Sequence, residues 1–306
     1  MNEALPERIS LGQSELRISP LGMGTNAWGF SRRADPSKQP ALEAAIAGGI
    51  NFIDTAEVYQ FGGSEKTLGA LLPEHRAELV LATKFFPYPW RLSKASLKAA
   101  LQGSLQRLGT PQVDLYILHF PMPPVPLESW VEALADVQQA GLARAVGISN
   151  CNARQTRQAQ ALLAARGLSL ASNQVEYSLL NRSVEHNGLL ETCRELGVTL
   201  VAYRPLGYGL LTGKYRPEDL PALLHGRLIR KSDLHRASGL IGLLSELGQT
   251  HGKTPAQVAL NWIICKGAVP IPGAKHAAQA TQNAGALGWR LEPAEVQALE
   301  QQAAFS

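Results

Sequence analysis

Short runs of apolar or β-branched residues recur along the chain at nearly regular intervals. Six of these runs begin 28 to 35 residues apart, at 51–54, 79–83, 114–118, 143–148, 171–175 and 199–203. The stretches between them place apolar residues on one helical face, as Leu97, Leu101, Leu105 and Leu108 do. Helices are therefore predicted over 93–108, 127–140, 153–166 and 187–196. Strands that alternate with helices at this period are typical of parallel βαβ units.

Two further short runs complete a set of eight strands, at 21–24 and 268–272. Eight is the number that closes a (β/α)8 TIM barrel, the fold class we expect, in one domain over residues 1–306. Residues 8–18, with a turn at Gly12, predict a β-hairpin that plugs the bottom of the barrel. Residues 277–285 are predicted as the eighth helix and 293–303 as an extra C-terminal helix.

The regular spacing breaks between 203 and 268. Residues 206–238 contain glycines, prolines and mixed charge, and helical patterns resume only at 240–247 and 254–265. A loop of this length inside a compact domain is usually functional.

Composition excludes several classes of function. The 29 basic and 25 acidic residues leave a net charge of +4 without a long basic run, which argues against a nucleic-acid partner. No apolar run is long enough to span a membrane. Three widely spaced cysteines indicate neither a disulfide framework nor a zinc site. We expect a cytoplasmic monomer that acts on a small molecule, without a metal.

Two local motifs resemble known functional signatures, but their sequence context does not support either function. Gly22-Met-Gly24-Thr-Asn-Ala27 matches a relaxed dinucleotide fingerprint, with Glu43 near the spacing of a ribose-binding acid. That motif should turn directly from a strand into a helix, whereas residues 28–36 are loop-like, so a Rossmann fold is rejected. Gly147-Ile-Ser-Asn-Cys151 lacks the final glycine of a nucleophile elbow, which excludes a serine hydrolase.

Four side chains with complementary chemistry lie at or just after predicted strand ends: Asp54, Tyr59, Lys84 and His119. In a βα barrel these ends meet at one mouth. Each residue alone has a structural interpretation, as a cap, a packing residue, a solvated cation or a core histidine. Together they suit carbonyl reduction: a nearby ammonium and imidazole would lower the pKa of Tyr59 so that it donates a proton, Asp54 would hold Lys84, and His119 would polarise the carbonyl oxygen.

The motifs around these residues resemble the successive signatures of the aldo-keto reductases. They are Asn51-Phe-Ile-Asp54-Thr-Ala-Glu-Val-Tyr59, Thr83-Lys84, Leu115-Tyr-Ile-Leu-His119, Gly147-Ile-Ser-Asn150 and Asn173-Gln-Val-Glu-Tyr177-Ser-Leu-Leu180. The resemblance extends from about residue 16 to 299 and is greatest to a prokaryotic and plastid branch that includes pyridoxal reductases. It implies an NADP(H)-dependent oxidoreductase that reduces aldehydes or ketones to alcohols, with the tetrad Asp54, Tyr59, Lys84 and His119 as catalytic residues and Tyr59 as general acid.

The same resemblance implies a set of residues that bind NADP(H) across the barrel mouth. Near the nicotinamide they are Thr25, Asn26, Asp54, Ser149, Asn150 and Gln174, with Tyr203 stacked on the ring. Around the pyrophosphate, under a closing segment over 207–238, they are Arg204, Pro205, Leu206, Gly207, Lys214 and Arg227. At the 2′-phosphate and adenine they are Gly273, Lys275, His276, Gln279, Gln282 and Asn283. Relatives have a serine in place of Arg204, which either pairs with phosphate or points to solvent. An arginine is common in place of His276, so the preference for NADP over NAD is weaker.

Aromatic residues near the predicted mouth suggest an apolar substrate wall made by Trp28, Phe85, Phe86 and Trp90. Pyridoxal, methylglyoxal, and lipid-derived or aromatic aldehydes stay open as substrates. The alternative is a slow or non-catalytic regulatory subunit of the same fold that binds NADPH, against which the intact tetrad argues.

Overall fold

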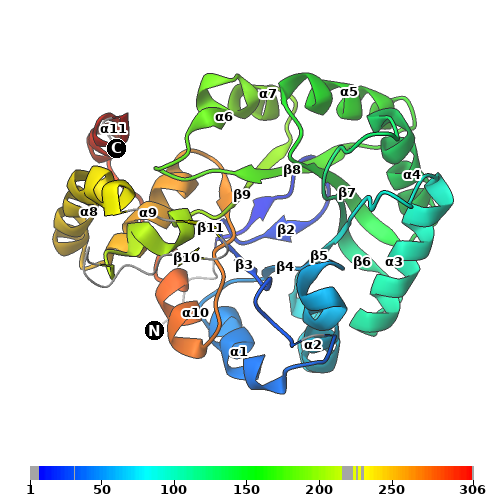
Figure 1. The fold of residues 1–306 in the computed structure, drawn as a ribbon, viewed down its shortest axis with the longest axis horizontal. Coiled ribbons are helices and arrows are strands. Elements are labelled where there is room, and N and C mark those ends of the chain that lie inside the picture. The colour runs from blue at the N-terminus through cyan, green and yellow to red at the C-terminus, as the bar shows by residue number, and fades with distance from the viewer. Residues whose placement is uncertain (1–6, 31, 216–222, 225–226, 229–230, 305–306) are drawn as a thin grey trace.

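Eight parallel strands form the wall of a barrel that is surrounded by helices (Figure 1). The computed structural model describes residues 7–30, 32–215, 223–224, 227–228 and 231–304. The strands pair in the order β12-β9-β8-β7-β6-β5-β4-β3. Their bounds are β3 Gly22–Gly24, β4 Phe52–Asp54, β5 Val80–Phe85, β6 Val113–Leu118, β7 Ala143–Ser149, β8 Leu170–Glu176, β9 Thr199–Tyr203 and β12 Val269–Pro270.

The barrel closes between the strands at the two ends of this order, β12 and β3. Gly24 forms an isolated parallel bridge with Gly273, and the Gly24 N–H donates to the Pro272 carbonyl at 3.0 Å. A Cβ atom on Gly24 would lie 3.1 Å from the Ile271 carbonyl oxygen, so a side chain there would crowd the seam. The predicted eight-stranded barrel is confirmed, although the last strand is shorter than the predicted 268–272.

The helices cover the outside of the barrel, and α11 packs on α8 as the expected extra C-terminal helix. The short helices α2 and α6 had not been predicted. The bounds are α1 Gln39–Ala47, α2 Gly63–Leu71, α3 Lys94–Leu108, α4 Leu127–Gln139, α5 Ala153–Ala164, α6 Ser183–His186, α7 Leu189–Glu195, α8 Lys231–His251, α9 Pro255–Cys265, α10 Ala277–Ala284 and α11 Pro293–Ala304.

The prediction of an irregular segment over 206–238 is wrong at both ends. A 3-10 turn, η5, covers Gly207–Thr212, and helix α8 begins at Lys231. The Ser238-Gly239 pair weakens helical propensity, but Leu234, Ala237 and Leu240 are buried on one face, so tertiary packing outweighs it. Between these elements, β10 Leu223–Leu224 pairs antiparallel with β11 Arg227–Leu228. The remaining positions of the predicted closing segment, 216–222, 225–226 and 229–230, lie outside the described residues.

The N-terminal hairpin closes one end of the barrel, as predicted. Strands β1 (Ile9–Ser10) and β2 (Arg17–Ile18) pair antiparallel, and Leu11, Leu16 and Ile18 are buried against side chains of the barrel interior. Gly12 has φ +59°, and its N–H donates to Thr199 Oγ1 at 2.7 Å. A Cβ atom there would lie 2.5 Å from the Ala171 carbonyl oxygen, so the turn needs glycine on both counts.

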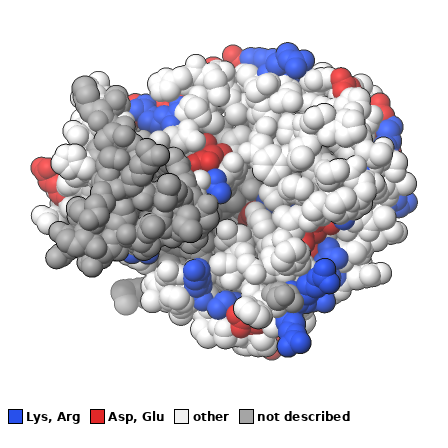
Figure 2. All heavy atoms as spheres, viewed as in Figure 1, with Lys and Arg blue, Asp and Glu red and all other residues white. Residues whose placement is uncertain are grey.

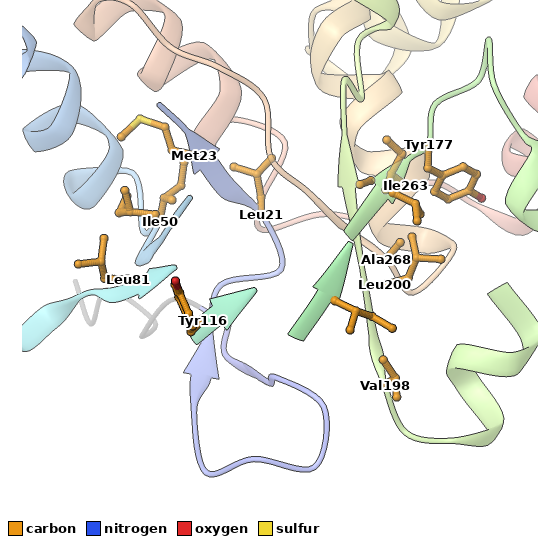
Figure 3. Close-up of a cluster of buried hydrophobic side chains, with 14 of the residues drawn as sticks. Leu21, Met23, Ile50, Leu81, Tyr116, Tyr177, Val198, Leu200, Ile263 and Ala268 are labelled. Carbon is orange, nitrogen blue, oxygen red and sulfur yellow. The ribbon is translucent and has the colours of Figure 1, made fainter. Parts of the chain in front are cut away.

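Successive residues of each strand face opposite sides of the barrel wall. Val80 and Ala82 belong to the cluster inside the barrel, whereas Leu81 and Phe85 pack in the layer between strands and helices. Figure 3 shows part of that outer layer, with Leu81 and Leu200 among its buried side chains. This alternation decides which strand residues can reach the mouth.

The surface does not concentrate charge of one sign on the face seen in Figure 2, where basic, acidic and uncharged side chains are interspersed. Among the described residues, no helix combines the length and apolar character needed to cross a membrane. The same residues contain no group of three or more His, Cys, Asp or Glu side chains arranged to hold a metal ion.

Candidate active site

A buried ion pair joins the ends of β4 and β5. Lys84 Nζ lies 2.6 Å from Asp54 Oδ1, and the two side chains are 0% and 2% exposed. The ammonium also donates to the Thr55 carbonyl at 2.8 Å and to the Tyr59 hydroxyl at 3.2 Å, which uses all three of its N–H donors. Burial alone would lower the pKa of Lys84, but its charge interactions and hydrogen bonds with Asp54 and Tyr59 together outweigh burial and hold that pKa above its usual value. Lys84 is therefore a permanent cation.

Tyr59 stands over this pair at the start of the 3-10 turn η2, Tyr59–Gly62. Lys84 Nζ lies 4.8 Å from the centre of its ring. Burial raises the pKa of the Tyr59 phenol, and the neighbouring Lys84 ammonium opposes this rise without cancelling it. The expectation of a lowered pKa is therefore wrong, because desolvation of the phenolate exceeds the stabilisation by one cation. Tyr59 keeps its proton at neutral pH.

His119 follows β6 and completes the group. Its ring meets the Tyr59 ring edge to face, with centroids 6.0 Å apart, and Asn150 Nδ2 donates to its carbonyl at 3.0 Å. Burial and the Lys84 charge lower the pKa of His119 to about 3, so the imidazole is neutral at physiological pH. Its buried Nδ1 has no hydrogen-bond partner within the described part of the chain. The four side chains picked out at the strand ends thus lie together.

A hydrogen-bond network supports Asp54 from the opposite wall of the barrel. Gln174 Nε2 donates to Asp54 Oδ2 at 2.8 Å, a contact that the sequence did not reveal. Ser149 Oγ donates to the Gln174 carbonyl at 2.7 Å, and Asn150, with φ +58°, accepts from the Tyr203 hydroxyl at 2.9 Å. These four residues, expected at the nicotinamide, also order one another.

Arg204 was expected either to pair with phosphate or to point to solvent, and the structure shows a third arrangement. It has φ +53°, and its guanidinium pairs with Glu176 at 3.2 Å while it lies 4.5 Å from the Tyr208 ring centre and 5.6 Å from that of Tyr203. At 45% exposure the side chain faces solvent, yet it is anchored by a carboxylate and two rings rather than free.

The start of α10 carries the residues expected at the 2′-phosphate. Lys275 and His276 are exposed, and the Lys275 N–H donates to Gln279 Oε1 at 2.7 Å. Asn283 is buried, and its Nδ2 donates to the Gly273 carbonyl at 3.3 Å. Gln282 is exposed. Gln279 and Asn283, expected on the base, therefore hold the loop that carries Lys275.

The other expected cofactor residues occupy varied environments. Thr25 is fully buried and its hydroxyl donates to the Asp54 carbonyl at 2.9 Å, while Asn26 beside it is exposed. Pro205 is buried, and Leu206 is partly buried before the turn at Gly207, which has φ +53°. Lys214 is exposed, with Nζ 4.8 Å from the Tyr215 ring centre. The backbone of Arg227 lies in β11, and its side chain lies outside the described part of the structure.

Two of the four residues expected in the substrate wall are placed wrongly by the sequence. Phe85 is fully buried behind the wall, where its ring centre lies 4.9 Å from that of Trp130, because it neighbours the inward Lys84 on the same strand. Trp28 is also fully buried, and its Nε1–H donates to the Ala274 carbonyl at 2.6 Å across the closing seam. Phe86 is partly exposed beside His119, and Trp90 is 73% exposed.

Sequence reasoning missed a buried ion pair next to Tyr59. Glu57 lies in the same turn and binds Arg91 through both carboxylate oxygens. The available signal was a glutamate between two apolar residues, Ala56 and Val58, directly before Tyr59, because a buried carboxylate requires a cation.

All three cysteines are free thiols. Cys151 and Cys193 are buried, which raises the pKa of each thiol to about 12. Cys265 is partly exposed.

A family model described as the aldo/keto reductase family matches residues 20–304, nearly the whole chain. The chain belongs to the aldo/keto reductase family. Its members are oxidoreductases, in agreement with the resemblance drawn from the motifs.

Known relatives of this aldo/keto reductase extend over nearly all of its length. The chloroplastic pyridoxal reductase of Arabidopsis thaliana is 39% identical across 96% of this chain and 85% of its own length. The solved glycerol dehydrogenase of Gluconobacter oxydans has a TM-score of 0.87 at 26% identity and covers 97% of this chain and 95% of its own. An aldo-keto reductase of Klebsiella pneumoniae, solved in complex with NADPH, has a TM-score of 0.77 at 28% identity, with the same coverage of both chains.

Proposed function

We propose that this protein reduces aldehydes or ketones to alcohols with NADPH, and that Tyr59 is the general acid. The observation that carries the proposal is the buried chain from Asp54 through Lys84 to Tyr59, with neutral His119 beside it. A protonated phenol next to a fixed ammonium is a proton donor whose product, the phenolate, has a cation at hydrogen-bond distance. This arrangement suits a reaction that develops negative charge on a carbonyl oxygen.

Each member of the tetrad has one task in the proposed reduction. The carbonyl oxygen lies between Tyr59 and His119, where the neutral imidazole donates an N–H to it and Tyr59 transfers its proton. Lys84 stabilises the resulting phenolate, and Asp54 keeps Lys84 charged and aimed. When bound, NADPH supplies the hydride for the carbonyl carbon.

The residues present fit a nicotinamide dinucleotide phosphate. The side chains of Ser149, Asn150 and Gln174 offer amide and hydroxyl groups next to Asp54, as a carboxamide requires, and the ring of Tyr203 lies beside them. At the other end, exposed Lys275 and His276 precede the N-terminus of α10, where positive charge and backbone N–H groups favour a phosphate. The NADPH complex of the Klebsiella pneumoniae structure supports this cofactor.

The aromatic side chains around His119 favour aromatic aldehydes among the possible substrates. The Phe86 ring centre lies 5.7 Å from that of His119, and the Phe120 ring stacks on His119 at 5.1 Å. Pyridoxal, an aromatic aldehyde, is the substrate named for the relative from Arabidopsis thaliana. We therefore propose aromatic aldehydes, pyridoxal included, as the first compounds to test.

The test is the change Tyr59→Phe, assayed by NADPH consumption with pyridoxal and benzaldehyde. Loss of the proton donor should lower kcat by about 100-fold or more, while the Kd for NADPH stays within about twofold. Tyr88→Phe is the matched control, because it removes a phenol hydroxyl near the mouth that does not contact Lys84. Near-normal turnover by Tyr59→Phe would contradict the role of Tyr59, and a wild type that binds NADPH but reduces no carbonyl compound would favour the regulatory alternative.

A further inference from the structure

An aromatic stack leads from the catalytic centre to the solvent along the segment between β5 and α3. Residues 86–93 have no helix or strand. The ring of Phe86 meets His119 edge to face at 5.7 Å, the Tyr88 ring lies 4.8 Å from Phe86, and Trp90 stacks on Tyr88 at 4.7 Å with an angle of 6° between the planes. An irregular segment needs specific contacts to keep three rings aligned in this way.

Phe86, at the start of that segment, and Arg91, near its end, both bind one carboxylate, that of Glu57. The Phe86 N–H donates to Glu57 Oε1 at 2.7 Å, and the Arg91 guanidinium binds both carboxylate oxygens, with 3.1 Å to Oε2. Arg91 also donates to the Phe86 carbonyl at 2.8 Å, which closes the segment into a loop. Its guanidinium carbon lies 5.1 Å from the Tyr88 ring centre, so the same side chain also contacts the stack.

The ion pair is sheltered from water and is attached to the catalytic turn. The side chains of Glu57 and Arg91 are 6% and 20% exposed, and a bidentate pair in such surroundings fixes both distance and orientation. Glu57 lies between Asp54 and Tyr59 in the chain, so a single carboxylate connects the turn of the proton donor to the aromatic stack.

We propose that the Glu57–Arg91 pair is a positioning device that holds the stack of Phe86, Tyr88 and Trp90 over the catalytic centre and so sets a preference for aromatic over small aliphatic carbonyl compounds. The proposal rests on the reductase function proposed above. A small aldehyde reaches Tyr59 and His119 without contacting the stack. An aromatic aldehyde gains binding energy from ring contacts only when the three rings are held in place. Loss of the pair should therefore change selectivity more than catalysis.

The experiment compares wild type with Arg91→Met, which keeps an apolar stem of similar length. Values of kcat and KM are measured at saturating NADPH with 4-nitrobenzaldehyde and with propanal. The ratio of kcat/KM for the aromatic aldehyde to that for propanal should fall about tenfold, mainly through a higher KM for 4-nitrobenzaldehyde. Arg91→Lys keeps the charge but loses the bidentate contact. Its ratio of kcat/KM values should therefore lie between those of wild type and Arg91→Met.

A matched control comes from a second buried pair in the same part of the barrel. Arg107 Nε donates to Glu65 Oε2 at 2.6 Å, with side-chain exposures of 26% and 0%, and neither side chain is a partner of the aromatic stack. Arg107→Met should destabilise the protein comparably and leave the selectivity ratio unchanged. If Arg91→Met does not fold, Glu57→Gln provides the same comparison.

An unchanged ratio in Arg91→Met, or an equal fall in Arg107→Met, would overturn the proposed positioning role. A wild type that consumes NADPH with neither aldehyde would instead contradict the proposed function. The two failures are therefore distinguishable within one set of assays.

Discussion

Replacing Lys84 by methionine should destabilise the protein far more than the loss of a surface lysine. The change keeps most of the apolar stem but removes an ammonium that binds Asp54, the Thr55 carbonyl and the Tyr59 hydroxyl at 2.6, 2.8 and 3.2 Å. Asp54 would stay buried at 2% exposure with Gln174 as its one remaining described side-chain donor. Breaking one partner out of a buried pair costs about 3 to 5 kcal/mol, because the other charge stays desolvated.

The magnitude can be measured by denaturant or thermal unfolding at pH 7. At about 2 °C per kcal/mol for a chain of this size, Lys84→Met should lower Tm by about 6 to 10 °C. The raised pKa of Lys84 in the folded protein means that its contribution is complete below the unfolded pKa of about 10.4 and is lost only as the pH rises through the folded value. Neutral pH is therefore well inside the window in which the pair stabilises the fold.

Two further variants separate the ion pair from general loss of a side chain. The double variant Asp54→Asn with Lys84→Met removes both charges and should recover at least half of the lost stability. Lys94→Met breaks an exposed pair with Glu132, whose members are 46% and 44% exposed, and should change stability by less than about 1 kcal/mol. The reasoning would be refuted if Lys84→Met lost less than about 1 kcal/mol of unfolding free energy. It would also be refuted if the double variant lost as much as the single variants Lys84→Met and Asp54→Asn together.

Two remaining predictions concern the cofactor and the barrel seam. Lys275→Met should remove most of the discrimination between NADPH and NADH, a contribution of about 1 to 3 kcal/mol, and an unchanged ratio of the two Kd values would contradict the placement of the 2′-phosphate at α10. Trp28→Phe should lower stability by about 1 to 3 kcal/mol more than Trp130→Phe and weaken NADPH binding, because only Trp28 loses a hydrogen bond, to Ala274. Equal unfolding free energies for the two variants would show that this bond does not stabilise the seam.

The barrel could be predicted from sequence because its short apolar strands recur at nearly regular intervals along the chain. That Asp54, Tyr59, Lys84 and His119 lie together could be predicted for the same reason, since strand ends meet at one mouth. The side of the barrel wall that each side chain faces was harder to predict. Lys84 and Phe85 are neighbours on strand β5, so they face opposite sides, and Phe85 packs toward the helices. The beginning of helix α8 was predicted too late, at 240 instead of Lys231, because burial of Leu234 and Ala237 outweighs a local sequence that disfavours a helix. Long-range contacts of this kind leave little trace in a local pattern.

The pKa of Tyr59 could not be predicted from the identity of its neighbours alone. The sequence identifies the cation next to the phenol but not how completely both are removed from water. In the structure burial exceeds the effect of Lys84, so the pKa of Tyr59 rises, and His119 cannot help to lower it because its own pKa falls to about 3. The result is a neutral donor beside a permanent cation. In the proposed reduction the ammonium contributes little to the resting phenol and most once the proton has left, when a phenolate stands at hydrogen-bond distance from Lys84. Stabilisation that increases along the reaction is what accelerates it.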